Sequence, residues 1–384
     1  MTSLLLAIIY ISFVSLGLPD ALLGAAWPIM QVELNVPVSY AGGISLIIAI
    51  GTVISSLQAD RLIKWLGTGK IMVISVAMTA LAIYGFSVST VFWHLCLWAI
   101  PYGLGAGCVD ASLNNYVALH YASRHMSWLH CMWGLGASIG PYIMGAALTG
   151  GLHWSMGYGV IAVLQVLLTA VLLLSMPLWK KKNQESQDGT RKAPLTMKKI
   201  LAIPGAKEVM LAFFCYCALE QSAILWGSSY LVVRDGMPEE TAASLASLYL
   251  MGLTLGRGLN GFLTYKISDE NLIRLGQGII ALGILIMVLP LGPVVSFVGL
   301  MLTGLGSAPV YPCIIHSTPA HFGEENSQAL IGVQMASAYV GIGVMPPIFG
   351  IIARYLSASL LPWYMGAILV LMIVMCEKLN RICK

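Results

Sequence analysis

The sequence is short of charge. Only 9% of its 384 residues are Asp, Glu, Lys or Arg, whereas soluble domains carry about 25%. Hydrophobic residues make up 58% of the chain, and the mean hydropathy is +0.84. A surface with so little charge could not keep a monomer dissolved in water. The composition therefore excludes the ordinary soluble classes and indicates a protein embedded in a lipid bilayer.

Motifs for catalysis are also lacking. The chain has no HExxH zinc motif, no paired aspartate-rich motif, no nucleotide-binding motif and no stretch that could form an appended soluble domain. Its eight cysteines show no metal-ligand spacing and lie in apolar runs or near the C-terminal end, which is typical of packing thiols. We therefore expect no catalytic residues, no metal or other cofactor and no nucleic-acid partner. A membrane enzyme or a non-transporting sensor is the distant alternative.

Long hydrophobic runs dominate what is present. A membrane-spanning helix needs roughly 20 apolar residues, and breaks at charged or Pro/Gly-rich turns predict twelve such segments. The first, which contains "SLLLAIIYISFVSLG", lacks the basic start and the cleavage site of a secretory signal, so we predict a retained helix. The predicted spans are 4–32, 38–58, 70–90, 92–119, 127–150, 155–178, 206–233, 241–264, 271–290, 293–316, 327–354 and 358–377.

One long polar stretch, "KKKNQESQDGTRKAPLTMKK", divides the chain near its midpoint. It predicts a linker over 180–205 between two six-helix halves, 1–179 and 206–384. On this map most basic residues lie on one side of the bilayer, so the net charge of +4 reports topology rather than an anionic partner. The positive-inside rule then places the linker and both termini in the cytoplasm and the protein in the cell membrane. The basic residues on that side are Arg61, Lys64, Lys70, Arg124, those of the linker, Lys266, Arg274, Lys378, Arg381 and Lys384.

Two joined six-helix halves favour an all-α membrane fold with paired repeats. Each half would hold two inverted three-helix units, with a cavity between the halves near mid-membrane. A twelve-helix protein without a cavity is the alternative, and the polar residues inside the spans bear on the choice.

Four ionisable residues lie deep in the predicted spans: Asp20, Asp110, Glu220 and Arg257. An ionised residue at a helix centre costs about 2.5 to 3.5 kcal/mol, so three acids facing lipid would cost on the order of 8 to 10 kcal/mol. That sum is comparable to the stability of a whole domain. These side chains must therefore face protein or a wet cavity.

The two acids of the first half have no intramembrane Arg or Lys to neutralise them. Asp20 and Asp110 must then be solvated, protonated or bound to a ligand, which predicts that they bind and release a coupling proton. For Arg257 two interpretations stay open: it gates the transporter, or it braces the protein by pairing with Glu220.

Helical spacing extends the candidate binding site in the first half. Asn114 follows Asp110 by four residues and Trp27 follows Asp20 by seven, which places each pair on one helix face. His130 and Trp133 lie three apart in "LHCMWGLGASIGP". A lone intramembrane histidine can also be a structural donor, and this alternative stays open for His130.

The second half adds Glu220, Gln221 and Trp226, with Tyr311 in "SAPVYPCIIHS". The prolines around Tyr311 could break their helix where it lines a cavity. Aromatic faces beside amides and carboxylates suit a sugar, whose CH face stacks while its hydroxyls form hydrogen bonds. The alternative is that Trp133 and Trp226 are packing or interface residues.

Several motifs resemble the fucose permease branch of the major facilitator superfamily, the fucose/glucose/galactose:proton symporters. They are the mid-helix acid of "LGLPDALLG", the pattern "GCVDASLNN", and "ALEQSAILWGSSYL", "GRGLNGFL" and "GLGSAPVYP", and the similarity runs over nearly the whole chain. The resemblance implies a twelve-helix transporter in which the acids of helices 1 and 4, here Asp20 and Asp110, serve substrate recognition and proton coupling.

The chain also departs from that family. The fucose transporter usually has glutamate in helix 4 and an amide in helix 5, where this chain has Asp110 and His130. The loop "QADRLIKWLGTGK" matches the superfamily's signature only in part, because Asp60 and Arg61 are present while Gly67 is displaced. The resemblance implies gating roles for Asp60 and Arg61.

Together these patterns predict a secondary transporter that imports a monosaccharide or a related small polar solute with a proton. We expect a monomer in the bilayer. An exporter of a drug or metabolite, with the acids serving antiport, is the alternative within the same fold, and the polarity of helices 4, 5 and 7 argues against it.

Overall fold

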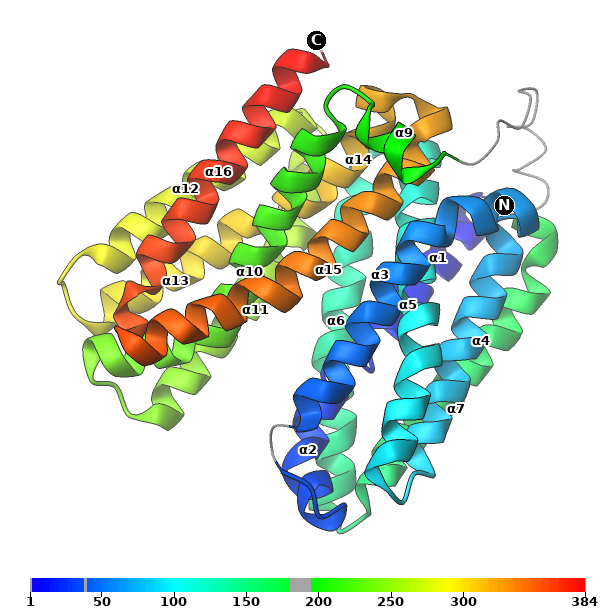
Figure 1. Ribbon diagram of the computed structural model, residues 1–384, viewed down its shortest axis with the longest axis horizontal. Helices are drawn as coiled ribbons and strands as arrows, with labels where there is room; N and C mark the ends of the chain where they lie inside the picture. Colours follow the sequence, from blue (N-terminus) through cyan, green and yellow to red (C-terminus); the bar gives the residue numbers. More distant parts are fainter. Residues whose placement is uncertain (1, 38–39, 180–194, 384) are drawn as a thin grey trace. The chain divides into compact units, whose positions relative to one another are not determined.

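The computed structural model describes residues 2–37, 40–179 and 195–383. Every regular element in these ranges is a helix, which agrees with the predicted all-α fold (Figure 1). Most of the predicted linker, residues 180–194, lies outside the described ranges. The α-helices are α1 Thr2–Gly17, α2 Leu22–Glu33, α3 Tyr40–Leu66, α4 Thr68–Ser87, α5 Phe92–His120, α6 Ser123–Thr149, α7 Trp154–Leu174, α9 Met197–Leu201, α10 Ala206–Asp235, α11 Glu239–Leu263, α12 Asp269–Val288, α13 Pro293–Ser307, α14 Val310–Phe322, α15 Glu324–Tyr355 and α16 Leu361–Ile382; the short 3₁₀ helix η1 is Ala358–Leu360.

Most of these helices can cross a bilayer. Within the described ranges, eleven segments are long and apolar enough to do so. The remaining predicted span corresponds to α11, a helix of 25 residues that carries Arg257. At about 1.5 Å per residue it is also longer than the roughly 30 Å of hydrocarbon. The chain is a multi-pass membrane protein.

The first predicted span is interrupted rather than continuous. α1 ends at Gly17 and α2 begins at Leu22, with Pro19 and Asp20 in the turn between them. Proline has no backbone N–H and disfavours helical geometry in the residue before it. The turn is closed by short-range bonds, from Asp20 N to the Gly17 carbonyl at 3.1 Å and from Leu22 N to the Pro19 carbonyl at 3.1 Å. Asp20 therefore lies at a break in the helix and not along a helix face.

A second span is broken at a proline, as the sequence predicted. The segment expected over 293–316 consists of α13 and α14, separated at Ala308 and Pro309. Here the structure confirms the predicted break next to Tyr311. Irregular backbone at membrane depth is tolerated only where protein or water satisfies its polar groups.

The chain divides by its contacts into two compact units. Unit 1 is Met1–Tyr116 with Leu129–Pro194, and unit 2 is Val117–Trp128 with Leu195–Lys384. The division differs from a cut at the linker alone, because residues 117–128, where α5 ends and α6 begins, group with the second half.

In unit 1, close helix contact determines how the polar residues are arranged. Gly136 and Gly140 of α6 lie against the backbone of α1 and of the turn after it. A Cβ atom on Gly136 would lie 2.0 Å from the Val14 carbonyl oxygen, and one on Gly140 would lie 2.0 Å from that of Leu18. Small residues four apart permit this approach between membrane helices. α6 is therefore held directly beside the break that carries Asp20.

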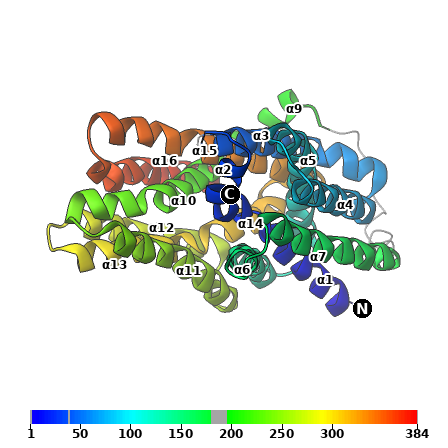
Figure 2. The same ribbon diagram turned by 90° about the horizontal axis from the view of Figure 1, so that it is seen from below.

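In unit 2, α10 packs along α15 and α16, and α12 packs on α13 (Figures 1 and 2). The α12 and α13 pair is also a glycine contact: a Cβ atom on Gly283 would lie 2.6 Å from the Gly299 carbonyl oxygen, and one on Gly299 would lie 2.7 Å from that of Gly283. This packing fixes the helices that carry Asp269 and the break before α14.

Candidate functional site

Asp20 is held between two neutral donors in unit 1. The Tyr102 hydroxyl of α5 donates to Asp20 Oδ1 at 3.0 Å, and the Trp133 indole N–H of α6 donates to Asp20 Oδ2 at 2.8 Å. The residue is exposed on the surface of unit 1. A carboxyl that is oriented yet open is suited to exchange hydrogen bonds with a polar solute.

Asp110 lies in a different setting, at the end of a hydrogen-bonded chain. Asn114 Nδ2 donates to Asp110 Oδ1 at 2.7 Å and also to the Asp110 carbonyl at 3.0 Å. The Asn114 amide oxygen in turn lies 3.0 Å from His130 Nε2. Since the amide oxygen can only accept, this orientation places the proton of His130 on Nε2. All three residues are buried, with exposures of 6%, 0% and 5% for Asp110, Asn114 and His130.

α6 connects the two acids. His130 reaches the Asp110 chain and Trp133 binds Asp20, and these residues, three apart, are neighbours on one helix face. The edge of the Phe13 ring packs on His130 with ring centroids 5.4 Å apart. The structure thus brings together Asp20, Asp110, Asn114, His130 and Trp133 within unit 1. Spacing in the sequence had paired only Asn114 with Asp110 and His130 with Trp133.

Trp27 lies elsewhere. It is 5% exposed and belongs to the hydrophobic core of unit 1, in the cluster that also contains Tyr102 and Trp154. The seven-residue spacing that paired it with Asp20 assumed a continuous helix, and the break at Pro19 removes that relation. Trp27 contributes to the core around Tyr102.

Glu220, the acid predicted within the membrane in unit 2, forms an ion pair. Arg257 of α11 lies 3.1 Å from Glu220 of α10, with the arginine side chain 3% exposed. The Tyr216 hydroxyl donates to the same Glu220 oxygen and lies 3.3 Å from Arg257. The Tyr311 ring lies beneath the guanidinium, with its centroid 5.8 Å away. The contact that the bracing interpretation of Arg257 requires is therefore present.

The other aromatic candidates of unit 2 make packing contacts. The Trp226 indole N–H donates to the Pro346 carbonyl of α15 at 2.9 Å. Its ring packs against Gly350 of the same helix, where an added Cβ atom would lie 2.8 Å from Trp226 Cζ2. The Tyr311 hydroxyl lies 3.2 Å from Met335 Sδ. Gln221 is half-buried on α10.

The two residues predicted to gate the protein lie within helix α3 rather than in the predicted loop, because the helix continues to Leu66, and they differ in burial. Asp60 is 5% exposed and pairs with Lys64 at 2.9 Å, while its Oδ1 has no hydrogen-bond partner. Arg61 is exposed and donates to the Gln58 side chain at 3.4 Å. Gating by this pair stays a prediction.

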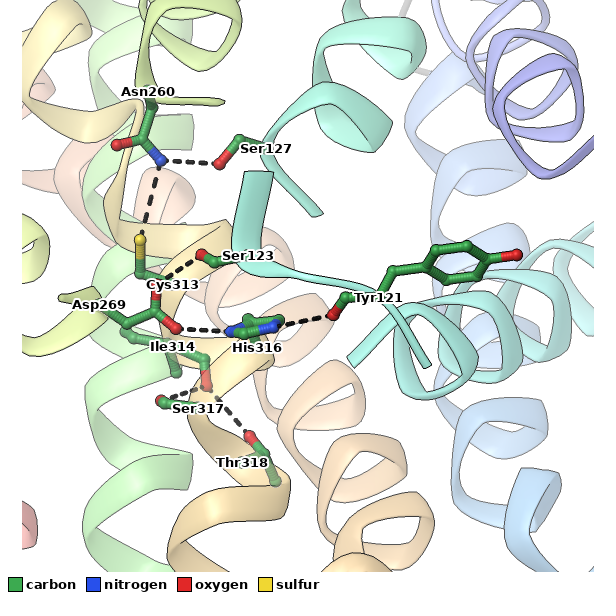
Figure 3. A network of polar contacts seen from close by, with 10 residues as sticks. All are labelled: Tyr121, Ser123, Ser127, Asn260, Asp269, Cys313, Ile314, His316, Ser317 and Thr318. Atoms are coloured by element: carbon green, nitrogen blue, oxygen red, sulfur yellow. Dashed lines mark hydrogen bonds and ion pairs between the residues drawn. The ribbon is translucent and has the colours of Figure 1, made fainter. Parts of the chain in front are cut away.

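Two features escaped the sequence reasoning. Tyr102 supplies half of the Asp20 site, and its position after Pro101 in an apolar run was the available signal. The second feature is a polar network in unit 2 around Asp269 and His316 (Figure 3). His316 stands inside "VYPCIIHS", where a histidine in an apolar run could have been noticed. Among the described residues, no group of three or more His, Cys, Asp or Glu side chains could hold a metal ion.

Comparison with known proteins extends these observations. The model of one family, described as Major Facilitator Superfamily, matches residues 9–315 and 236–379. A curated protein of Saccharomyces cerevisiae, "Bypass of stop codon protein 6", is 22% identical over 283 residues, which are 68% of this chain. The chain spans 57% of the length of that relative.

Solved transporter structures share the fold. The outward conformation of the transporter FucP superposes with a TM-score of 0.78 at 16% identity, covering 96% of this chain and 98% of that one. A structure of a variant of the E. coli fucose:proton symporter FucP also superposes with a TM-score of 0.78 at 16% identity, covering 97% of this chain and 98% of that one. The proton:xylose symporter XylE, bound to 6-bromo-6-deoxy-D-glucose, superposes with a TM-score of 0.78 at 13% identity, covering 97% and 94% of the two chains.

Proposed function

Because the chain belongs to the major facilitator superfamily, a family of transporters and not of enzymes, we propose that it is a proton-coupled symporter of a monosaccharide or a related small polar solute. The observation that carries the proposal is the pair of acids in unit 1. Asp20 binds two neutral donors, and Asp110 lies at the end of the chain from His130 through Asn114. The sugar:proton symporters among the proteins of similar fold support the same function.

The two acids have different roles in this proposal, because they differ in exposure. Asp20 is open on the surface of unit 1, where the Trp133 and Tyr102 hydrogen bonds hold its carboxylate in place to accept a further hydrogen bond from a solute hydroxyl. Asp110 is buried, so we assign it to binding the coupling ion. That ion is H⁺ rather than a metal ion in this proposal. The intramembrane cost of a charge favours the protonated form of such an acid until water reaches it from the other side. Coupling follows if only one state of the cycle gives that access.

His130 and Asn114 have a relay role in this scheme. Asn114 uses its amide nitrogen toward Asp110 and its oxygen toward His130. Protonation of Asp110 removes the negative charge that the Asn114 amide faces, and the amide transmits that change to His130 on α6. Because Trp133 lies one helical turn from His130, α6 couples the proton site to the substrate-binding acid.

A symporter of this kind requires a defined orientation in the cell membrane. The basic residues predict that the linker and both termini are cytoplasmic. On a cysteine-depleted background, cysteines placed at Ser186 and at Glu239 should be labelled by an impermeant thiol reagent from opposite sides. Labelling from the same side would contradict the assigned topology.

The proposed function itself is tested by uptake. Purified protein in proteoliposomes should accumulate at least one member of a panel of neutral monosaccharides and polyols when a proton gradient is imposed, and accumulation should stop when a protonophore removes the gradient. Accumulation driven by sodium alone, or active efflux of hydrophobic cations with no sugar transport, would replace the proposal by a sodium symporter or an exporter.

A further inference from the structure

Residues 117–128 are attached to the rest of unit 2 by polar contacts (Figure 3). The Ser123 hydroxyl donates to Asp269 Oδ1 at 2.5 Å, and Asn260 Nδ2 donates to the Ser127 hydroxyl at 2.7 Å. The Trp128 indole N–H donates to the Gly258 carbonyl at 3.2 Å. The segment at the end of α5 and the start of α6 is thereby joined to α11 and α12.

His316 is the central member of this network. Its Nδ1 lies 2.6 Å from Asp269 Oδ2, and its Nε2 lies 3.2 Å from the backbone carbonyl of Tyr121. Figure 3 shows the imidazole placed between these two oxygens. It links α12 to the turn between α5 and α6.

The geometry specifies how many protons the site holds. A backbone carbonyl only accepts, an ionised carboxylate only accepts, and a neutral imidazole has a single N–H. With Asp269 ionised and His316 neutral, one ring nitrogen would present its lone pair to an oxygen lone pair. Both contacts are satisfied when one further proton is bound, either on the imidazole or on Asp269 Oδ2. The short Ser123 contact occupies the other carboxylate oxygen.

We propose that Asp269 and His316 form a second proton-binding site, and that its proton holds residues 117–128 to α12 and α14. When the proton leaves, one of the two hydrogen bonds of His316 is lost and the segment is attached less tightly. α5 and α6 continue from this segment into unit 1, so movement of unit 1 is transmitted to these contacts through the chain. The site is separate from Asp20 and Asp110, which belong to unit 1.

Other ionisable groups surround the site. Cys313 of α14 lies beside Asp269, and His321, further along α14, is within electrostatic range of Asp269 and Glu270 of α12. From α6, Arg124 stacks on Tyr265 at 5.0 Å, and His125 packs edge-on against Tyr121. His316 contacts both Asp269 and the Tyr121 carbonyl.

The consequence for transport rests on the proposed function. Under the predicted topology this end of α5 and α6 is cytoplasmic, so protons carried inward would strengthen the attachment and slow further turnover. The proton site itself does not depend on that function, and its test uses no transport measurement.

Hydrogen exchange of the full-length protein in lipid nanodiscs tests the proposal. Histidine titrates between about pH 5 and pH 8. After correction for the intrinsic pH dependence of exchange, the backbone amides of peptides covering 117–128 should exchange roughly tenfold faster at about pH 8 than at about pH 5. Tenfold corresponds to about 1.4 kcal/mol, in the range of one hydrogen bond to a charged group. Peptides from α4 and α7 of unit 1 provide the internal reference.

Two variants separate the proton from the contacts. Asp269→Asn supplies an amide N–H to His316 Nδ1 without a bound proton, so the segment should stay protected at both pH values. His316→Leu should leave it open at both. His125→Gln, on the same segment, changes an imidazole that packs on Tyr121 and Trp128, and it should keep the wild-type pH dependence. Equal wild-type exchange at the two pH values, or an unchanged pH response in Asp269→Asn, would overturn the proposal, and the wild-type comparison decides it even where a variant does not fold.

Discussion

The two units treat an intramembrane acid in opposite ways. In unit 1, Asp20 accepts hydrogen bonds from Tyr102 and Trp133, which carry no charge. In unit 2, Glu220 pairs with Arg257 at 3.1 Å. An ionised acid with neutral partners leaves its site with a net negative charge, whereas an ionised acid opposite a cation forms a neutral pair. From this difference we expect the substrate- and proton-binding acids within the membrane to belong to unit 1, and the Glu220–Arg257 pair to brace unit 2.

Removing the cation of unit 2 should have the largest effect. Arg257→Leu leaves Glu220 without its counter-ion, and breaking a buried pair in this way costs about 3 to 5 kcal/mol. Thermal unfolding of the purified protein should show this loss as a large drop in melting temperature.

Two variants sharpen that comparison. The double variant Arg257→Leu with Glu220→Leu should recover most of the stability, because no charge is left unpaired. Asp20→Asn, which removes an acid but leaves no cation unpaired, should cost about 1 kcal/mol or less. Equal destabilisation by Arg257→Leu and Asp20→Asn would remove the distinction between the units.

The close approach of α6 to α1 should come next in magnitude. Gly140→Ala places a methyl group 2.0 Å from the Leu18 carbonyl oxygen, and overpacking of this kind costs about 1 to 3 kcal/mol. The shift of α6 should also lengthen the Trp133 bond to Asp20 and weaken substrate binding. Gly145→Ala is the matched control on the same helix, because nothing lies within 4 Å of its added Cβ. It should leave stability and binding unchanged or slightly improved, and similar losses in both variants would show that the glycine contact does not position the site.

A smaller effect is expected from the indole donor of Asp20. Trp133→Phe keeps most of the ring but removes the N–H that binds Asp20 Oδ2 at 2.8 Å. Substrate affinity should fall roughly tenfold, since a hydrogen bond to a charged group contributes about 1.5 kcal/mol or more. The same change at Trp226 removes a bond to the Pro346 carbonyl and should lower stability while affinity is retained. Calorimetric or fluorescence binding measurements distinguish the two, and loss of affinity in Trp226→Phe alone would move the substrate contact to unit 2.

The membrane-spanning fold and part of the candidate site in unit 1 could be predicted from the sequence, because both depend on local patterns. Hydrophobic runs of bilayer length predict spans without any tertiary information, and a spacing of four along one continuous helix brought Asn114 to Asp110. The same reasoning misplaced Trp27, because the helix is broken at Pro19. Residues after the break no longer share a helix face with residues before it.

Contacts between distant segments were beyond the sequence. Tyr102 meets Asp20 across 82 residues, and His316 meets the Tyr121 carbonyl across 195. Neither distance has a periodicity that could predict it. The Gly136 and Gly140 approach that places Trp133 depends on which helix faces α6, which only tertiary packing decides.

The central claim is that Asp110 carries the coupling proton, and one comparison tests it most directly. Asp110→Asn resembles the protonated acid in size and can still form a hydrogen bond with Asn114. In proteoliposomes this variant should retain counterflow, the exchange of substrate across the membrane without a gradient. It should lose accumulation driven by a proton gradient, because no proton can be released. Full uphill accumulation by Asp110→Asn would contradict the account.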